Sequence, residues 1–154
     1  MREGFDILRW VKEVKAKKPE MDALVASLRK YGASVEPDKD SNDIASLHYR
    51  VVFSFLEQEA IVTIGIILLD HQTNSDVVIE TMTTLPNNKI RKGFGSKAIA
   101  NILQWAADNG FKDVCATQVA GEDNENFWRK NGFLRQENPK PCNDFVFRFP
   151  RESA

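Results

Sequence analysis

The chain has little cysteine, little net charge and no long apolar run. Its two cysteines could form at most one disulfide, and Cys115 lies in an apolar strand pattern that favours a buried thiol in a reducing compartment. A formal net charge of −1 gives no overall field that would attract nucleic acid or a membrane surface. No apolar stretch approaches the length of a bilayer span, and the charged first residues lack the apolar segment of a signal peptide. We therefore expect a cytoplasmic protein with no nucleic-acid or membrane partner.

The remaining composition is that of an ordinary globular domain. Hydrophobic residues make up 42% and charged residues 28% of 154 residues. A chain of this length buries roughly 70% of its unfolded surface and needs no cross-links for stability. We expect one domain over residues 1–154, with a helical N-terminal part over 1–34 and a core over 45–149. Helical spacing of apolar residues predicts two N-terminal helices, separated by Pro19.

After a polar loop at residues 36–43, the apolar period changes from helical to alternating. Strands are predicted over residues 47–55, 61–69 and 77–85, and their short connections indicate an antiparallel meander. Gly65 interrupts the second of these strands and marks a bulge or a close backbone approach. Beyond them the pattern predicts a helix ending at Asn109-Gly110, a strand over 111–117, a helix over about 122–131, and strands over 133–135 and 145–149. This order predicts an α/β (α+β) fold with a mixed, mostly antiparallel sheet flanked by helices.

A basic turn with two glycines carries most of the functional information. Gly93 and Gly95 follow Arg91 and Lys92, and a helical pattern begins directly after them. Glycine lets the backbone approach a ligand closely, and the N–H groups of a first helical turn attract anions, so the turn predicts a phosphate site. The turn also fits a loose dinucleotide pattern with Ala98, but a polar loop and antiparallel strands precede it. A plain loop before a helix is the remaining alternative.

Three local patterns, in this order, resemble the GNAT-type N-acetyltransferase superfamily over residues 45–149. The glycine turn resembles the family's Gln/Arg-x-x-Gly-x-Gly/Ala motif, although its first position falls on Ile90. Leu85-Pro86 resembles the family's V-x-P strand end, with one extra residue before the glycines. Phe127-Trp128-Arg129-Lys130-Asn131-Gly132-Phe133 resembles the family's F-Y-x-K-x-G-F helix end.

The resemblance implies acetyl-coenzyme A as co-substrate and no metal. The pyrophosphate would bind the backbone amides of the glycine turn, and the pantetheine arm would pair with the exposed end of the third meander strand, as an added strand does. The implied coenzyme-binding residues are Met82, Thr83, Thr84, Leu85, Arg91, Lys92, Gly93, Phe94, Gly95, Ser96 and Trp128.

The implied reaction is acyl transfer to a primary amine, which needs a base and an oxyanion donor. Glu80 is the candidate base. A carboxylate inside an apolar strand suggests a function, and partial burial would raise the pKa of Glu80. A paired or edge-facing surface glutamate is the equal alternative. The oxyanion donor would be a backbone N–H at the strand end, at Thr83 or Thr84. Tyr49 and His48 are further candidates, although we expect Tyr49 to pack in the core and His48 to be solvated.

Trp128 occupies the position where many family members carry a tyrosine that protonates the leaving thiolate. An indole N–H donates a hydrogen bond but cannot give up a proton. The leading hypothesis is therefore an N-acetyltransferase acting on an amine of a small molecule or a protein. A non-catalytic coenzyme A-binding or protein-interaction module is the alternative, and a nucleotide-binding protein of another kind is a third. Exposed edge strands near the C-terminus favour a homodimer.

Overall fold

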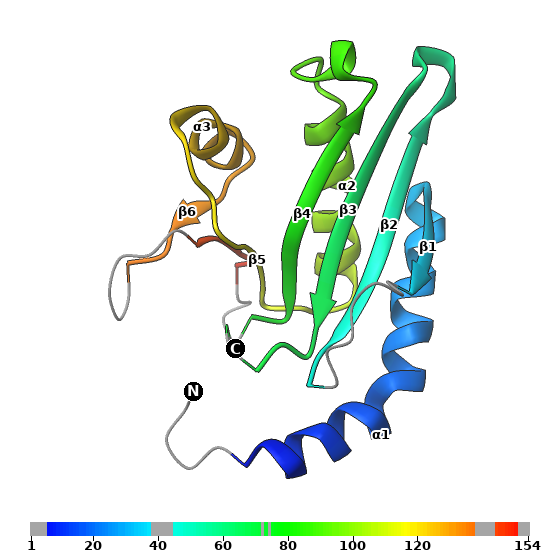
Figure 1. Ribbon diagram of the computed structural model, residues 1–154, viewed down its shortest axis with the longest axis vertical. Coiled ribbons are helices and arrows are strands. Elements are labelled where there is room, and N and C mark those ends of the chain that lie inside the picture. The colour runs from blue at the N-terminus through cyan, green and yellow to red at the C-terminus, as the bar shows by residue number, and fades with distance from the viewer. Residues whose placement is uncertain (1–5, 38–44, 72, 74, 138–143, 151–154) are drawn as a thin grey trace.

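The computed structural model of the chain describes residues 6–37, 45–71, 73, 75–137 and 144–150. A seven-stranded sheet in the order β1-β2-β3-β4-β5-β7-β6 forms the centre of the described part, and helices flank it (Figure 1). The strands are β1 (Ala33–Pro37), β2 (Leu47–Phe55), β3 (Ala60–Leu68), β4 (Val77–Leu85), β5 (Asp113–Ala116), β6 (Leu134–Arg135) and β7 (Phe145–Arg148). The pairing of β4 with β5 is parallel and the other pairings are antiparallel. The predicted mixed, mostly antiparallel sheet is confirmed.

The helices connect these strands much as the sequence predicts from the meander onward. They are α1 (Ile7–Ala26), α2 (Phe94–Asp108) and α3 (Glu122–Lys130), with short 3-10 turns η1 (Ser27–Tyr31), η2 (Leu56–Gln58) and η3 (Asn87–Lys89). Strands β2, β3 and β4 form the antiparallel meander, and α2 links β4 to its parallel neighbour β5. No helix in the described part of the chain is long and apolar enough to cross a membrane.

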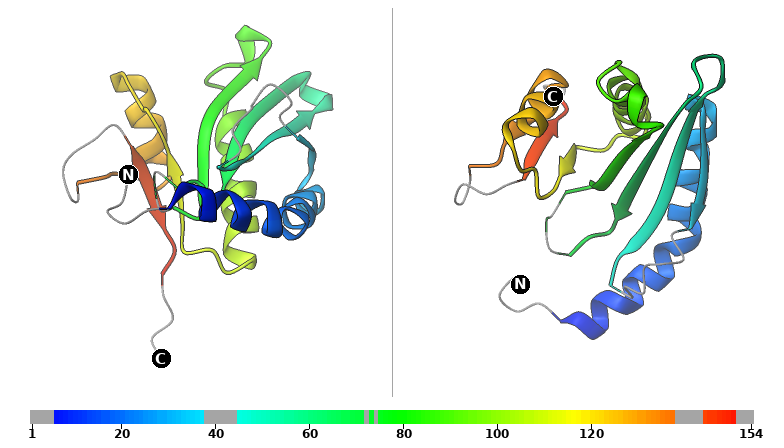
Figure 2. Two further views of the ribbon diagram at one scale, coloured as in Figure 1. Left: turned by 60° about the horizontal axis from the view of Figure 1, so that its bottom comes forward. Right: turned by 45° about the horizontal axis from the view of Figure 1, so that its top comes forward.

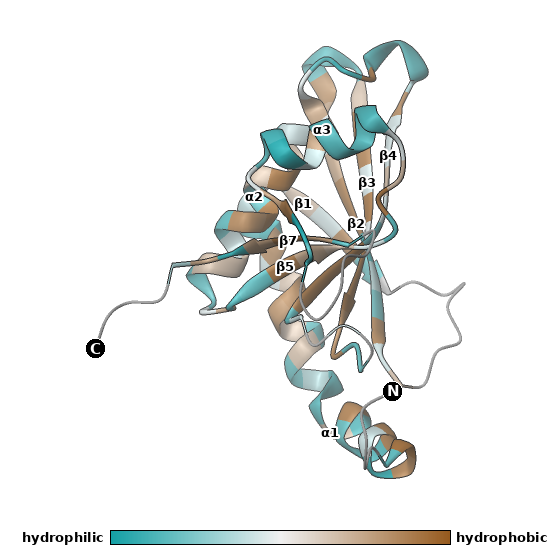
Figure 3. Cartoon of the chain, turned by 90° about the vertical axis from the view of Figure 1, so that its left-hand side faces the viewer, coloured by the Kyte–Doolittle hydropathy of each residue, from teal (hydrophilic) through white to brown (hydrophobic). Residues whose placement is uncertain are grey.

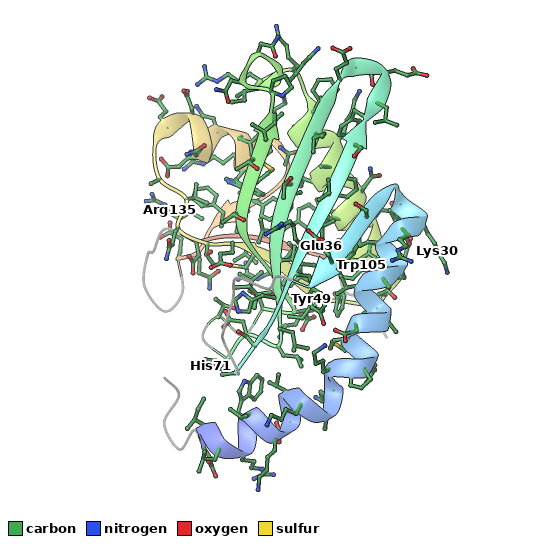
Figure 4. The ribbon with its side chains drawn as sticks, turned by 45° about the vertical axis from the view of Figure 1, so that its right-hand side comes forward. Lys30, Glu36, Tyr49, His71, Trp105 and Arg135 are labelled. Carbon is green, nitrogen blue, oxygen red and sulfur yellow. The ribbon has the colours of Figure 1, made fainter. Side chains whose placement is uncertain are left out.

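The prediction of two N-terminal helices is wrong. One helix, α1, runs through Pro19 and bends part-way along its length (Figure 4). Proline removes one intrahelical hydrogen bond and clashes with the preceding turn, so a bend rather than a break is the local response. The helix continues because Val14 and Val25, on either side of the proline, are both buried in the core.

An additional strand, β1, follows the N-terminal helical part at the edge of the sheet. Gly32, at φ 90°, ends η1, and the chain then pairs antiparallel with β2. The loop predicted over 36–43 is therefore wrong at Glu36 and Pro37, which belong to β1. The rest of that predicted loop lies outside the described residues. Proline is tolerated in an edge strand such as β1, which has a partner strand on one side only.

Helices α1 and α2 pack on one face of the sheet and form the main core with it. Tyr49 and Trp105 lie between the sheet and the second half of α1 (Figure 4). Tyr49 is buried, as expected, and its hydroxyl donates to Asp22 Oδ1 at 2.6 Å. Burial and this hydrogen bond to a carboxylate raise the pKa of Tyr49 well above its usual value of 10.0. The indole N–H of Trp105 donates to the Leu24 carbonyl at 3.1 Å, which joins α2 to α1.

The opposite face of the sheet holds a second, smaller cluster. Ile67, Val78, Cys115 and Val146 come from β3, β4, β5 and β7, and all four are buried. The prediction that Cys115 is a buried thiol position is confirmed, and Cys142 lies outside the described residues. Because Val78 and Cys115 are paired in register, this cluster holds β4 and β5 together at one end only.

Candidate active site

Strands β4 and β5 are paired at one end and separate at the other. Their register runs from Val77–Val114 to Ile79–Ala116, and its last bond joins the N–H of Thr117 to the carbonyl of Ile79 at 3.2 Å. Beyond Ile79, β4 continues to Leu85 along β3 alone. Figure 1 and the right-hand view in Figure 2 both show α3 standing away from β4. The exposed edge of β4 is thereby available for a ligand to pair with.

A cleft of about 780 Å³ lies where the two strands part. One wall is the second half of β4, the other is the end of β5 with α3, and the glycine turn closes the top. Most residues of α3 are hydrophilic (Figure 3). The predicted site residues that line this cleft are Glu80, Met82, Thr83, Thr84, Leu85, Arg91, Gly93, Gly95, Ser96 and Trp128.

Two residues of the predicted coenzyme site do not line the cleft. The side chain of Phe94 is buried in the core, where its ring centre lies 5.1 Å from that of Phe55. Lys92 is exposed outside the cleft, so its charge acts from a distance. Phe94 begins α2. The residues around a glycine turn do not show whether a side chain in the first helical turn enters the core or faces the ligand.

The glycine turn presents backbone N–H groups that have no partner inside α2 to the top of the cleft. Gly93, at φ 91°, is the N-cap of α2 and has no side chain to cap it. The first hydrogen bond of the helix runs from the Lys97 N–H to the Gly93 carbonyl at 3.1 Å. The N–H groups of the three intervening residues therefore have no partner within the helix. A left-handed φ at this position requires glycine, which explains why Gly93 is used here.

Gly95 leaves room where the two walls of the cleft approach. A Cβ atom at Gly95 would lie 3.4 Å from the Phe127 ring of α3 and 3.5 Å from Met82 Cε of β4. Nearby, the Asn131 amide of the α3 end donates to Ser96 Oγ at 3.2 Å. The glycine turn is thus held against both walls, with a space at Gly95 that any side chain would fill.

An ion pair spans the mouth of the cleft. The Arg91 guanidinium donates to the Asp123 carboxylate at 2.5 Å, from the glycine turn to the first turn of α3. Both side chains are more than three-quarters exposed, so the pair is screened by solvent and weakly held. A phosphate arriving at the turn could therefore compete with Asp123 for Arg91.

Glu80 lies at a bulge of β4. Ile79 pairs with Ile66 and Thr81 pairs with Gly65, so Glu80 is an extra residue with no partner in β3. The bulge predicted at Gly65 is confirmed. The Glu80 side chain is 50% exposed, so the partial burial expected from its apolar neighbours is small. A bulge redirects a side chain out of the regular alternation, and here it brings the carboxylate to the cleft.

His48 is not solvated, contrary to expectation. Its side chain is 12% exposed, and its Nδ1 lies 3.6 Å from Glu80 Oε2. Strand alternation correctly placed His48 on the face of the sheet away from α2. The sequence could not show that the Glu80 side chain reaches His48 from the far side of β3.

Trp128 both packs in the core and lines the cleft. It is 8% exposed. Its ring centre lies 5.1 Å from that of Phe127 and 4.9 Å from that of Phe133, and both contacts are edge-on. The sequence missed other lining residues, chiefly Thr117 and Gln118 at the end of β5. Their position just after a parallel strand is where ligands bind in parallel sheets, and that signal was available.

A comparison with models of known protein families agrees with the resemblance drawn from the sequence. The model of the acetyltransferase (GNAT) family matches residues 21–133. The chain belongs to the GNAT acetyltransferase family. The family match begins inside α1 and ends just after α3, so it includes both walls of the cleft and the glycine turn.

A solved structure is also similar to this GNAT chain. It is a domain from Methanocaldococcus jannaschii with 15% sequence identity and a TM-score of 0.42. The match covers 68% of this chain and 66% of that domain. The chain therefore spans just under two thirds of the length of that domain. No curated protein matches the sequence. Among the described residues, no three His, Cys, Asp or Glu side chains are grouped so that they could hold a metal ion.

Proposed function

We propose that this GNAT protein is an acetyl-coenzyme A-dependent N-acetyltransferase that acts on a primary amine of a small molecule or a protein. The observation that carries the proposal is the parting of β4 from β5 beneath a glycine turn with unpartnered N–H groups. The cleft volume of about 780 Å³ lies within the roughly 300–1,000 Å³ range of ligand pockets. The space at Gly95 fits a group that must approach the backbone closely.

The residues of the cleft divide into those that would hold the donor and those that would act on the amine. The N–H groups at the start of α2 and the Arg91 guanidinium supply positive charge for a diphosphate. The carbonyl of Ile79 faces β5, so after the one-residue bulge we expect the peptide groups of Met82 and Thr84 to face the cleft as well. These groups would pair with an amide-bearing arm and direct an N–H at the carbonyl oxygen.

Acetyl-coenzyme A, when bound, supplies an acetyl thioester that is attacked by the amine. We propose that the Glu80 carboxylate accepts the proton of the ammonium, directly or through one water, and passes it to solvent at its exposed side. The new C–N bond replaces the C–S bond, and coenzyme A leaves as its thiolate, which takes a proton from solvent because the Trp128 indole cannot give one up. A positioned base typically contributes about 10²–10⁴-fold to the rate, so loss of Glu80 should be measurable.

A thermal-shift comparison tests the donor. A ligand at 100 times its Kd stabilises the folded state by about 2.7 kcal/mol, which for a chain of this size is a rise in Tm of roughly 5–11 °C. Acetyl-coenzyme A should produce this rise, and NAD, which fits the looser dinucleotide pattern, should produce none. A larger shift with NAD than with acetyl-coenzyme A would contradict the proposal.

Thiol release separates an enzyme from a coenzyme-binding module. The position of Trp128 favours the module as a second candidate, because no tyrosine stands there to protonate the thiolate. Release of free coenzyme A should be followed with spermidine, tyramine and a lysine-containing tetrapeptide as acceptors. We expect Glu80→Gln to lower turnover by at least tenfold and to leave the Kd for acetyl-coenzyme A unchanged. Binding without amine-dependent release in the wild type would support the module instead.

A further inference from the structure

His48 and Glu80 meet across an intervening strand. His48 belongs to β2 and Glu80 to β4, with β3 between them, yet His48 Nδ1 lies 3.6 Å from Glu80 Oε2. Neighbouring strands are about 4.8 Å apart, so the two backbones are separated by roughly twice that distance. Side chains that meet at this range must lean toward each other over β3, which requires an open space above that strand.

The register shift in β4 brings Glu80 within reach of His48. Gly65 lies in β3 between Arg50 of β2 and Thr81 of β4, on the face that carries His48. A Cβ atom at Gly65 would stand 2.6 Å from Thr81 Oγ1, so the Thr81 hydroxyl occupies the place that a side chain at Gly65 would take. The glycine and the bulge at Glu80 therefore occur at the same point of the sheet, and Glu80 lies beside them on the face that carries His48.

Ser46 holds the other side of the imidazole ring. Its hydroxyl oxygen lies 2.9 Å from His48 Nε2, and Ser46 is itself buried at 4% exposure. In the tautomer in which the Ser46 hydroxyl donates to Nε2, the ring proton is on Nδ1, the nitrogen that faces the carboxylate. Ser46, His48 and Glu80 thus form a polar series that runs from a buried position to the cleft.

We propose that His48 is a positioning residue that holds the Glu80 carboxylate in the orientation from which it accepts the amine proton. This role rests on the proposed acetyltransferase function. At 3.6 Å the ring acts on the carboxylate by electrostatic attraction rather than by a short hydrogen bond. His48 takes up no proton in the step, because the proton moves from the ammonium to Glu80 and then to solvent. A half-exposed glutamate has several side-chain rotamers, and the ring selects among them.

Nitrogen NMR of the histidine rings tests the contact without any acceptor. The chain has two histidines, so the spectrum of His71→Gln assigns the remaining ring signals to His48. We expect the wild-type His48 ring to carry its neutral-form proton on Nδ1. Glu80→Gln should shift the ring signals toward the Nε2–H form, and the matched control Glu57→Gln, at the far end of the β2–β3 hairpin, should not. Identical His48 signals in the wild type and Glu80→Gln would overturn the proposal.

Turnover in paired backgrounds tests the role. Asparagine can place its amide N–H near the position of Nδ1, whereas glutamine reaches only the position of Nε2. We therefore expect His48→Gln to lower kcat roughly fivefold and His48→Asn to retain most of it, with the Kd for acetyl-coenzyme A unchanged in both. In the Glu80→Gln background, His48→Gln should cause no further loss. An equal loss in both backgrounds, or a matching loss in His48→Asn, would overturn the positioning role.

Failure of the proposed acetyltransferase function and failure of the proposed His48 role give different results in these experiments. Absence of amine-dependent thiol release from the wild type with all three acceptors would remove the proposed enzyme function, while the ring spectra would still decide whether Glu80 controls the state of His48. Normal wild-type release with an unaffected His48→Gln would leave the acetyltransferase in place and remove His48 from its mechanism.

Discussion

Substitution of Gly95 should separate donor binding from folding. Gly95 is the second residue of α2 and has helical backbone geometry rather than a left-handed φ. An alanine Cβ there would lie 3.4 Å from the Phe127 ring and 3.5 Å from Met82 Cε, both ordinary contact distances. The methyl group therefore fits without displacing either wall, and we expect it to crowd a diphosphate that binds the backbone N–H groups of the same turn.

The expected effects on stability and binding have opposite directions. Alanine is more favourable than glycine within a helix by about 0.5–1 kcal/mol, so Gly95→Ala should raise the Tm by roughly 1–4 °C. Gly95→Glu should not lower stability by much, because a carboxylate in the first helical turn gains about 0.3–1 kcal/mol from the helix dipole. We expect the Kd for acetyl-coenzyme A to rise at least tenfold in Gly95→Ala, or about 1.4 kcal/mol. In Gly95→Glu we expect a rise of more than about a hundredfold, because the added charge also repels the phosphates.

Calorimetric titration with acetyl-coenzyme A and urea denaturation measure the two quantities. Ala100→Glu is the matched control, because it adds the same charge to the exposed side of the same helix. The control should bind as the wild type does. An unchanged Kd in Gly95→Glu would refute the reasoning that places the diphosphate at this turn. A loss of more than about 1 kcal/mol of stability in Gly95→Ala would instead show that the walls around the glycine are closer than described.

Three further variants test contacts that lie away from the β4 bulge. Asp123→Asn should release Arg91 and lower the Kd for acetyl-coenzyme A by up to roughly fivefold, because exposed ion pairs contribute about 0.2–1 kcal/mol; titration calorimetry at low and high salt measures this. Tyr49→Phe should cost about 1 kcal/mol at neutral pH, since it removes a hydrogen bond to the half-exposed carboxylate of Asp22. The raised pKa of Tyr49 adds stability that is complete below pH 10.0 and lost above it, so the alkaline decline in urea stability should be shallower in Tyr49→Phe. Gly132→Ala should cost about 1–3 kcal/mol in urea denaturation, because Gly132 has φ 91° and a Cβ would lie 2.7 Å from an aromatic ring of β7.

Each of these has an outcome that would contradict it. Weaker donor binding in Asp123→Asn would mean that Asp123 supports the turn rather than competing for Arg91. An alkaline stability curve that is the same in the wild type and Tyr49→Phe would remove the buried phenol as its cause. Gly110→Ala controls for backbone strain, because Gly110 also has positive φ but open space around it, so it should cost less than Gly132→Ala.

Local patterns determined most of the elements from the meander onward. Alternating apolar residues produced β2, β3 and β4, and the glycine at β3 marked the bulge. The N-terminal part was misread because proline is a strong local signal for a helix boundary, whereas buried valines on both sides of Pro19 hold one helix together. The edge strand β1 was missed because a short strand beside polar residues has little periodicity of its own.

The site divides in the same way between sequence and tertiary structure. A glycine turn is defined by adjacent residues, so its N–H groups and basic side chains could be found from the sequence. The cleft required β4 and β5 to separate after Ile79, and the meeting of His48 with Glu80 required residues more than thirty positions apart to lie on one face. Hydrogen-bond register and a one-residue bulge decide these distances. Both depend on how strands pair in three dimensions, which no local pattern specifies.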